Sequence, residues 1–385
     1  MTAPLLVANR AIQLLIPDFP SADELLPWLR RIDAARMYTN FGPLVGELER
    51  VLAQQWPMDS PCITEALSPI QVVTLSSGSA SLEVGIAGLQ LAQGGEVLLP
   101  ALTFPATAAA VLRNGLRPVF ADVAADTWQL SPAMARAAAA YRRLALVIPV
   151  ATFGCPLDVI AWDNFVDDTG IPVLMDAAAA FGNQPIGRRA HVALSLHATK
   201  PFGVGEGGLF VTRSDEIALR VRQLSNFGFS GGVVAIASGN AKMSEYTAAL
   251  ALAQWARWDK MQSGRRSKWA AYRAGLEAIP GMSLQAGFAA GDLPANLVIR
   301  FSSAADDVSN RLAGLGIPTR RWYYPTLEHH PAFNACQVFT PEASEGMPVT
   351  RRLAEHALGL PWHNFLSGNQ LDTILDALSR IETRP

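Results

Sequence analysis

Seven short apolar runs mark the chain between about residues 70 and 215, and stretches with helical spacing separate them. Continuous apolar runs of this length are typical of strands buried on both faces of a parallel sheet. After the first run, Leu82, Ile86 and Leu89 recur at the spacing of one helix face. The pattern predicts an α/β domain in which a mostly parallel seven-stranded sheet lies between helices. The runs occupy residues 72–75, 96–100, 117–123, 144–150, 172–177, 192–198 and 207–212.

The pattern changes after about residue 240. Residues 243–279 are predicted to form a long helix, and a smaller α/β domain is expected beyond it. The short strands of that domain are predicted at 296–302, 316–324 and 358–363. We therefore expect a large domain, a small C-terminal domain, and an N-terminal segment that packs on the small domain and the active site. Their expected bounds are 45–245, 246–385 and 1–44.

Composition limits the classes of partner. Half of the 385 residues are hydrophobic, so the chain can bury a large core, and the formal net charge of -2 argues against nucleic acid or an anionic membrane. Cys62, Cys155 and Cys336 form neither a metal-ligand cluster nor an even disulfide set, and the six histidines lack paired ligand spacing. The N-terminus lacks a signal-peptide pattern, and no apolar run reaches the ~18 residues of a membrane helix. We expect a cytoplasmic protein without a metal.

Candidate chemistry lies where the predicted strands end, because ligands bind beyond the carboxyl ends of parallel strands. The turn after the first run, residues 76–80, consists of Ser, Gly and Ala. Small residues let backbone N–H groups approach a phosphate at the positive end of a helix. The turn lacks the lysine of a P-loop and the spacing of a dinucleotide fingerprint, so a plain strand-to-helix turn fits it equally well.

Three more strand ends supply an aromatic ring, an acid and a lysine. Phe104 follows the second run, Asp176 ends an apolar run, and Lys200 follows Ser195. A lysine before a glycine-rich stretch, here 203–208, is by itself compatible with a solvated turn. A buried acid, however, is costly unless a positive group meets it. Together these features match what pyridoxal phosphate requires: a lysine to bond it, an acid at its ring nitrogen and amides for its phosphate.

A series of motifs in the order "SGSASLE", "PALTFPATA", "MDAAAAFG", "SLHATKPFGVGEGG" and "GNAKMSEYTAAL" resembles the DegT-type nucleotide-sugar aminotransferases. These enzymes depend on pyridoxal 5'-phosphate and have the aspartate aminotransferase fold, fold type I. The resemblance continues to "YTNFGPLVGELE" and to "GIPTRRWYYPTLEHHPAF", so it covers almost the whole chain. The interval of 24 residues between Asp176 and Lys200 lies in the family's usual range.

The resemblance implies a role for each residue of the motifs. Lys200 would bond the cofactor and move the proton, and Asp176 would pair with the pyridinium. Phe104 would stack on the ring, and Asn240 would reach the phosphate of the partner subunit in a homodimer. The remaining phosphate contacts would come from Gly78, Ser79 and Ser195.

The substrate residues lie in segments near the two ends of the chain. Tyr38, Phe41 and Tyr324 are expected to cover the sugar, while Arg321 or its neighbour Arg320 offsets the charge of the diphosphate. A mixed, solvated face is the alternative for this segment.

Two histidines complete the candidates. His329 follows the same segment and is expected at the substrate. His197, three residues before Lys200, is either an aid to proton transfer or a structural residue.

Three positions depart from the family pattern. Ala179 stands where the family has a glutamine that contacts the cofactor, and Ala151 stands where a histidine is common. Lys242 replaces the usual arginine, so a bidentate grip on a carboxylate would become a point charge.

The sequence therefore predicts a pyridoxal-phosphate aminotransferase that moves an amino group from glutamate to a nucleotide-linked keto sugar. Its pathway would make amino sugars for a surface polysaccharide or a secondary metabolite. Two alternatives remain. A pyridoxal-dependent sugar dehydratase would have a histidine in place of the lysine, so Lys200 argues against it. A non-catalytic regulatory protein that binds pyridoxal phosphate would keep the fold without turnover.

Overall fold

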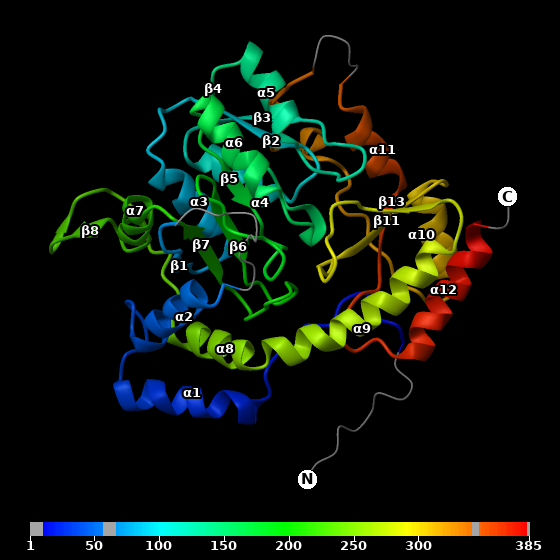
Figure 1. The fold of residues 1–385 in the computed structure, drawn as a ribbon, viewed down its shortest axis with the longest axis horizontal. Helices are drawn as coiled ribbons and strands as arrows, with labels where there is room; N and C mark the ends of the chain where they lie inside the picture. The colour runs from blue at the N-terminus through cyan, green and yellow to red at the C-terminus, as the bar shows by residue number, and fades with distance from the viewer. Residues whose placement is uncertain (1–10, 57–66, 341–345, 383–385) are drawn as a thin grey trace.

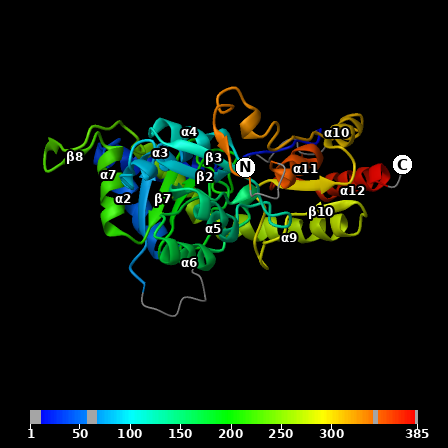
Figure 2. The same cartoon turned by 90° about the horizontal axis from the view of Figure 1, so that it is seen from above.

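A computed structural model describes residues 11–56, 67–340 and 346–382, which form two α/β units side by side (Figures 1 and 2). Cys62 lies outside the described residues, whereas Cys155 and Cys336 are free thiols. Within the described residues, no helix combines the length and the apolar character needed to cross a bilayer, and no cluster of histidine, cysteine, aspartate or glutamate could hold a metal ion.

The large sheet contains one strand in each of the seven apolar runs. Two four-stranded parts, in the orders β1-β7-β6-β5 and β12-β3-β2-β4, are linked by parallel bridges between Val147 and Val173 and between Val150 and Asp176. Only β7 runs against its neighbours β1 and β6, so the expected mostly parallel α/β architecture is confirmed. The strands are β1 Gln71–Leu75, β2 Glu96–Pro100, β3 Arg117–Ala121, β4 Leu144–Val147, β5 Leu174–Asp176, β6 His191–Ser195, β7 Gly208–Thr212 and the additional edge strand β12 Gln337–Val338.

Helices cover both faces of this sheet. Alternate residues explain why: Val192 and Leu194 of β6 point into one hydrophobic cluster, and Ala193 points into the other. The first cluster is formed with α2 Pro43–Gln54, α5 Pro132–Tyr141, α6 Val159–Thr169 and α8 Glu245–Ala256. The second is formed with α3 Gly78–Gly88, α4 Pro105–Arg113 and α7 Asp215–Ser225.

The predicted long helix at 243–279 is wrong in its continuity, because it is divided at Arg257 into α8 and α9 Trp258–Glu277. Helix α8 packs into the large-sheet core beside α2 and α1 Ala22–Ala35, whereas α9 extends into the smaller unit (Figure 1). We therefore propose that the boundary between the large and the small domain lies at Arg257, not at residues 245 and 246.

The smaller unit is a three-stranded antiparallel sheet with helices on it. The strands β10 Met282–Leu284, β11 Leu297–Phe301 and β13 Ala357–Leu360 have the order β10-β11-β13. Strands were expected at 296–302 and 358–363 and are present. Residues on α9 and on α12 Gly368–Glu382 complete its core together with α10 Ala305–Ala313, and α11 Pro348–His356 packs nearby.

The strand predicted at 316–324 is wrong. Arg320 alone makes a bridge there, giving its N–H to the Gly359 carbonyl at 3.1 Å and accepting the Gly359 N–H at 2.7 Å. The chain then turns toward the large domain, where Tyr323 stacks on Phe153 with ring centroids 5.6 Å apart. Tertiary packing of these aromatic side chains therefore prevails over the local β pattern.

Each unit also carries one peripheral segment. Residues 11–20 lie against the smaller unit, where the Leu14 carbonyl accepts the Trp362 N–H at 3.0 Å. A hairpin of β8 Phe229–Ser230 and β9 Val233–Val234 projects from the other end of the molecule (Figures 1 and 2). Two single turns of 3-10 helix, Thr152–Gly154 and Leu327–His329, complete the elements.

Candidate active site

Asp176 ends β5 and is buried with only 4% of its surface exposed. One carboxylate oxygen accepts the Thr107 hydroxyl at 2.7 Å, and the other accepts the Ala178 N–H at 3.1 Å. Burial raises the pKa of Asp176, while these two hydrogen bonds and the charge of Lys200 act in the opposite direction. The acid is therefore held in a fixed place with part of its acceptor capacity unused.

Lys200 lies in the turn after β6, where its N–H donates to the His197 carbonyl at 2.8 Å. Desolvation by the surrounding protein lowers the pKa of Lys200, and the charge of Asp176 opposes this shift. A lowered pKa increases the fraction of uncharged amine, which is the form that acts as nucleophile or base. This desolvated setting favours a reactive lysine over the solvated-turn alternative.

The β1–α3 turn forms a cradle of exposed amides. Ser77 caps α3 by accepting the Ala80 N–H at 3.1 Å, and within the described part of the chain the amides of Gly78 and Ser79 have no protein acceptor. A Cβ on Gly78 would lie 2.6 Å from the Cβ of Ser195, so only glycine allows this close approach. Free amides at the start of a helix, beside a serine hydroxyl, fit a phosphate.

Aromatic rings surround the same strand ends. Phe104 caps α4, has 61% of its surface exposed, and lies 6.5 Å from the ring of Tyr323. Burial and, secondarily, the charge of Asp176 raise the pKa of Tyr323, so this phenol stays protonated. Thr107 was not predicted at the site, because only a tertiary contact brings it to Asp176.

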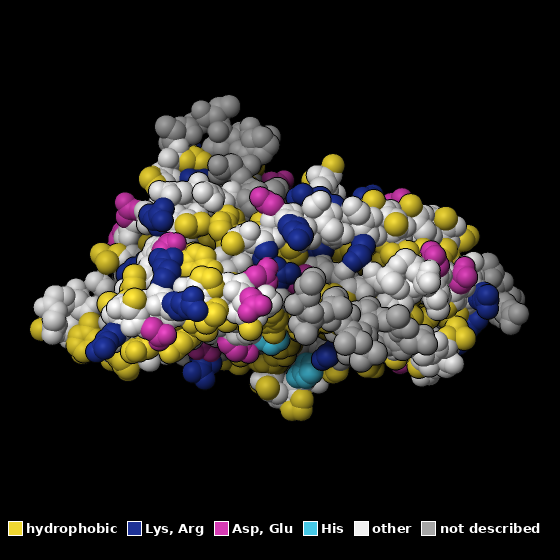
Figure 3. Space-filling view, turned by 90° about the horizontal axis from the view of Figure 1, so that it is seen from below, with side chains coloured by type: hydrophobic (Ala, Val, Ile, Leu, Met, Phe, Trp, Pro, Cys, Tyr) yellow, Lys and Arg dark blue, Asp and Glu magenta, His cyan; other side chains and the backbone are white. Residues whose placement is uncertain are grey.

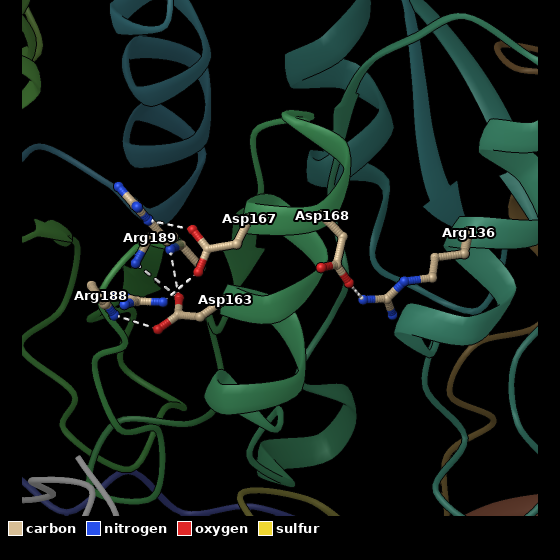
Figure 4. A network of polar contacts seen from close by, with 7 residues as sticks. Arg136, Asp163, Asp167, Asp168, Arg188 and Arg189 are labelled. Atoms are coloured by element: carbon tan, nitrogen blue, oxygen red, sulfur yellow. Dashed lines mark hydrogen bonds and ion pairs between the residues drawn. The ribbon is translucent and has the colours of Figure 1, made fainter. Parts of the chain in front are cut away.

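The charged network of Figure 4 fixes the other end of β6. Asp163 on α6 accepts the N–H groups of Arg188, Arg189 and Ala190 at 2.6, 2.8 and 3.1 Å. A Cβ on Gly187 would lie 2.8 Å from an Asp163 oxygen, so the turn requires glycine there. The arginines also pair with Asp167, and Arg136 pairs with Asp168. This network anchors the strand that leads to Ser195 and Lys200.

Four predicted substrate residues contact other side chains within the chain. Tyr38 is half exposed and stacks on Tyr246 at 6.2 Å. Phe41 lies under the Arg222 guanidinium at 5.3 Å. Arg321 pairs with Asp306, donates to the Ala354 carbonyl, and lies 3.8 Å above the ring of Tyr324. These contacts favour a structural role for Arg321 over binding of a diphosphate.

Both candidate histidines interact with neighbouring glutamates. His329 lies 3.6 Å from Glu328 and is largely exposed. The His197 ring contacts the Thr199 hydroxyl at 3.0 Å and Glu206 at 3.7 Å, which favours the structural alternative for it.

The three departures from the family pattern are spread over two places. Ala151 and Ala179 are buried near Asp176, and the Ala151 N–H donates to the Asp176 carbonyl at 2.9 Å. Lys242 instead donates to the Asn226 side chain at 2.7 Å and lies 4.8 Å from the centre of the Phe227 ring.

Asn240 is exposed at the base of the hairpin. It borders a cavity of about 500 Å³ that also touches Ser76, Ser77 and Ser79. A larger cavity of about 1030 Å³, lined by Arg117, Arg142 and Arg143 among others, opens at the amino ends of β2, β3 and β4. It lies on the side of the sheet opposite the strand ends that carry Asp176 and Lys200.

The residues at these strand ends fit pyridoxal 5'-phosphate. Gly78, Ser79 and Ser195 offer free amides and a hydroxyl for a phosphate, and Asp176 offers a carboxylate for a ring nitrogen. Lys200 is close enough to Asp176 that each shifts the pKa of the other. The donor set thus meets each chemical requirement of the cofactor.

Comparison with known proteins gives a consistent result. The profile of the DegT/DnrJ/EryC1/StrS aminotransferase family matches residues 23–379. Protein Rv3402c of Mycobacterium tuberculosis (strain ATCC 25618 / H37Rv) is 31% identical over 97% of this chain and 90% of its own length. The dTDP-4-amino-4,6-dideoxy-D-glucose transaminase of Shigella dysenteriae is 29% identical over 95% of this chain and 98% of its own. The crystal structure of DesI with its TDP-sugar product has a TM-score of 0.82 and 28% identity, over 98% of this chain and 94% of that one.

Proposed function

The chain belongs to the DegT/DnrJ/EryC1/StrS aminotransferase family, and from this premise we propose that it transfers an amino group from glutamate to a keto sugar linked to a nucleotide. The observation that carries the proposal is the buried carboxylate of Asp176 at a strand end, with Lys200 near enough for their charges to interact and with the free amides of Gly78 and Ser79 beside Ser195. The similarity to the Shigella transaminase and to DesI supports a nucleotide sugar as the acceptor. Such a reaction serves amino-sugar biosynthesis.

When bound, pyridoxal 5'-phosphate supplies an aldehyde that bonds amines and a ring that accepts an electron pair. Asp176, oriented by Thr107, would hold a proton at the ring nitrogen. Lys200 would bond the cofactor through Nζ, and desolvation favours its uncharged amine, which would move a proton as a base. The Gly78 and Ser79 amides and Ser195 would bind the phosphate. Phe104 would offer an aromatic face to the ring.

We further propose a homodimer. The projecting hairpin exposes Phe229, Val233 and Val234, whose side chains are 45%, 64% and 56% exposed, next to Phe227 at 44%. Figure 3 shows hydrophobic side chains at this end of the molecule, on the left. Exposed apolar groups that gather on a protruding element indicate a protein partner. A second copy would cover them and bring Asn240 to its phosphate site.

The amine-transfer experiment uses purified protein, pyridoxal 5'-phosphate, L-glutamate and a panel of dTDP- and UDP-linked keto sugars. We expect release of 2-oxoglutarate in equal amount to the amino sugar, with ping-pong kinetics. Lys200→Ala should abolish turnover and the borohydride-stable mass increase, while the exposed control Lys260→Ala should retain both. No turnover with any member of the panel, or labelling of another lysine, would contradict the proposal.

The assembly is tested by subunit mixing. If Asn240 serves the neighbouring site, hybrids of inactive Lys200→Ala and Asn240→Ala subunits should recover part of the activity. A fully active monomer in light scattering would overturn this arrangement. We also place the enzyme in the cytoplasm, since the described thiols Cys155 and Cys336 are free.

A further inference from the structure

A small cavity of about 30 Å³ borders Lys200 on the side of the smaller unit. Helix α9, the N-terminal segment and the end of β13 close it, and Figure 1 shows the dark blue N-terminal segment passing beside α9. A cavity of this size exceeds the ~10–15 Å³ that one water needs, so it has room for a group of a few atoms and not for a sugar. Its polar and aromatic lining consists of Asp18, Thr199, Lys200, Arg265, Trp362, His363 and Asn364.

Arg265 is the unusual member of this lining. It is 9% exposed and lies with its guanidinium 5.3 Å from the centre of the Trp362 ring. One Nη donates to the Pro294 carbonyl at 2.9 Å, whereas the buried Nε has no hydrogen-bond partner in the described structure. Burial lowers the pKa of Arg265 to about 10, so the side chain is still a cation at neutral pH. The charge of Asp18 acts in the opposite direction, but within the described residues no carboxylate is hydrogen-bonded to Arg265, so this buried cation keeps an unused donor.

The neighbouring carboxylate is already engaged. Asp18 pairs with Arg257 at 2.7 Å and also accepts the Asn364 amide, while Lys268 donates to the Asn364 carbonyl. Asp18 is therefore shared: it pairs directly with Arg257, and its charge also acts on Arg265 and Lys268.

His363 adds no charge to the cavity. Its Nε2 donates to the Gln13 carbonyl at 3.1 Å, and its Nδ1 accepts the Phe365 N–H at 3.2 Å. Burial lowers the pKa of His363 to about 4, so it is neutral under ordinary conditions. Among the charged groups of the lining, Asp18 is engaged by Arg257, so Arg265 remains as a cation without a carboxylate partner in the described structure.

We propose that Arg265 binds the α-carboxylate of the amino donor in this cavity. In an α-amino acid, a single carbon separates the reacting nitrogen from the carboxylate, so a donor that exchanges its amine at Lys200 must hold its carboxylate close by. The cavity supplies the charge and the volume for that group. The inference rests on the proposed amine transfer. It assigns the cavity beside Lys200 to the carboxylate of an α-amino acid, so the sugar would bind on the side of the site where Phe104 lies.

The test compares Arg265→Met with Arg266→Met as the matched control. Arg266 is exposed on the same helix and makes only a 3.5 Å contact with the Gly291 carbonyl. In single-turnover measurements on the holoenzyme, Arg265→Met should raise the half-saturating glutamate concentration about tenfold or more, since a lost charge-assisted hydrogen bond exceeds about 1.4 kcal/mol. The sugar half-reaction should be unchanged, and Arg265→Lys should be intermediate.

Calorimetry gives a readout that does not require turnover. Glutarate has the two carboxylates of glutamate without its amine, and its binding to the holoenzyme should weaken about tenfold in Arg265→Met and remain unchanged in Arg266→Met. If Arg265→Met does not fold, Arg265→Lys carries the same comparison. Equal loss in both half-reactions, or unchanged glutarate affinity, would overturn the inference. A wild type that binds glutarate through Arg265 but aminates no sugar would instead contradict only the proposed function.

Discussion

Asp163 and Asp176 are buried to nearly the same degree, 5% and 4% exposed, at opposite ends of the parallel strands β5 and β6. Asp163 accepts three backbone N–H groups and closes the turn that enters β6. Asp176 accepts one hydroxyl and one N–H, so part of its hydrogen-bond acceptor capacity is unused, and the charge of Lys200 acts on it. Burial alone therefore does not identify a reactive acid. What distinguishes Asp176 is incomplete hydrogen bonding together with a titratable partner.

Replacing Asp176 by asparagine should distinguish a reactive acid from a structural acid most clearly. Asp176→Asn keeps the shape and removes the charge that we propose holds a proton at the cofactor nitrogen, so kcat/KM should fall by about 10²–10³-fold. Burial raises the pKa of Asp176 above its unfolded value of 3.8, so the folded state binds this proton more tightly. The contribution of Asp176 to the free energy of unfolding then falls as the pH rises from the unfolded pKa to the folded pKa.

An amide cannot ionise, so Asp176→Asn should be at least as stable as the wild type at pH 7. Urea unfolding measures this, with Asp163→Asn in parallel. A variant of Asp176 that is both active and unstable would reverse the distinction between the two acids.

Asp163→Asn should show the opposite behaviour. The amide presents an NH₂ where an oxygen now accepts backbone N–H groups, which should lower the free energy of unfolding by about 2–4 kcal/mol. The folded fraction should keep most of its activity per cofactor bound. Urea unfolding monitored by circular dichroism gives the loss. Wild-type stability would mean that the turn does not depend on this carboxylate.

Thr107→Val tests the single hydroxyl that stabilises ionised Asp176. The Thr107 hydrogen bond lowers the pKa of Asp176, so its removal should raise that pKa. The acid limb of kcat/KM should therefore move to higher pH. Thr103→Val, which alters a neighbouring hydroxyl bonded to Thr107 at 2.9 Å, is the control. An unchanged acid limb would assign the limb to another group.

The smallest effect is expected at the rim of the Asp163 network. Arg136 and Asp168 form an ion pair with side chains 39% and 63% exposed. Solvent screens such pairs, so Arg136→Ala should change the free energy of unfolding by only about 0–1 kcal/mol. A loss comparable to that of Asp163→Asn would show that the ion pair helps to fix the turn.

The same contrast explains what the sequence predicts and what it does not. The seven strands follow from apolar runs, and Lys200, Asp176 and Gly78 follow from their places at strand ends, because both signals are local. Thr107 and Arg265 reach the site from helices distant in the chain, and no local pattern sets them apart from other threonines and arginines.

Two elements were predicted incorrectly for the same reason. The helix at 243–279 has no proline or glycine at the point where it divides, and the bend at Arg257 arises where α8 and α9 pack against different cores. Residues 316–324 have the composition of a strand, but the stacking of Tyr323 on Phe153 places the end of this segment at the active site. The assigned phosphate and substrate contacts stay predictions.

Beneath the cofactor site, glycines let one backbone segment lie in direct contact with another backbone segment or with a Cβ atom. A Cβ on Gly208 would lie 2.2 Å from the Ser77 carbonyl oxygen, and one on Gly203 would lie 2.5 Å from the Ala198 carbonyl oxygen. Neither position admits a larger residue without moving the chain. The surrounding segments that carry Tyr38 and Tyr324 expose their rings to solvent. New substrate preferences can therefore evolve by stepwise change at the periphery while the chemistry beneath is inherited intact.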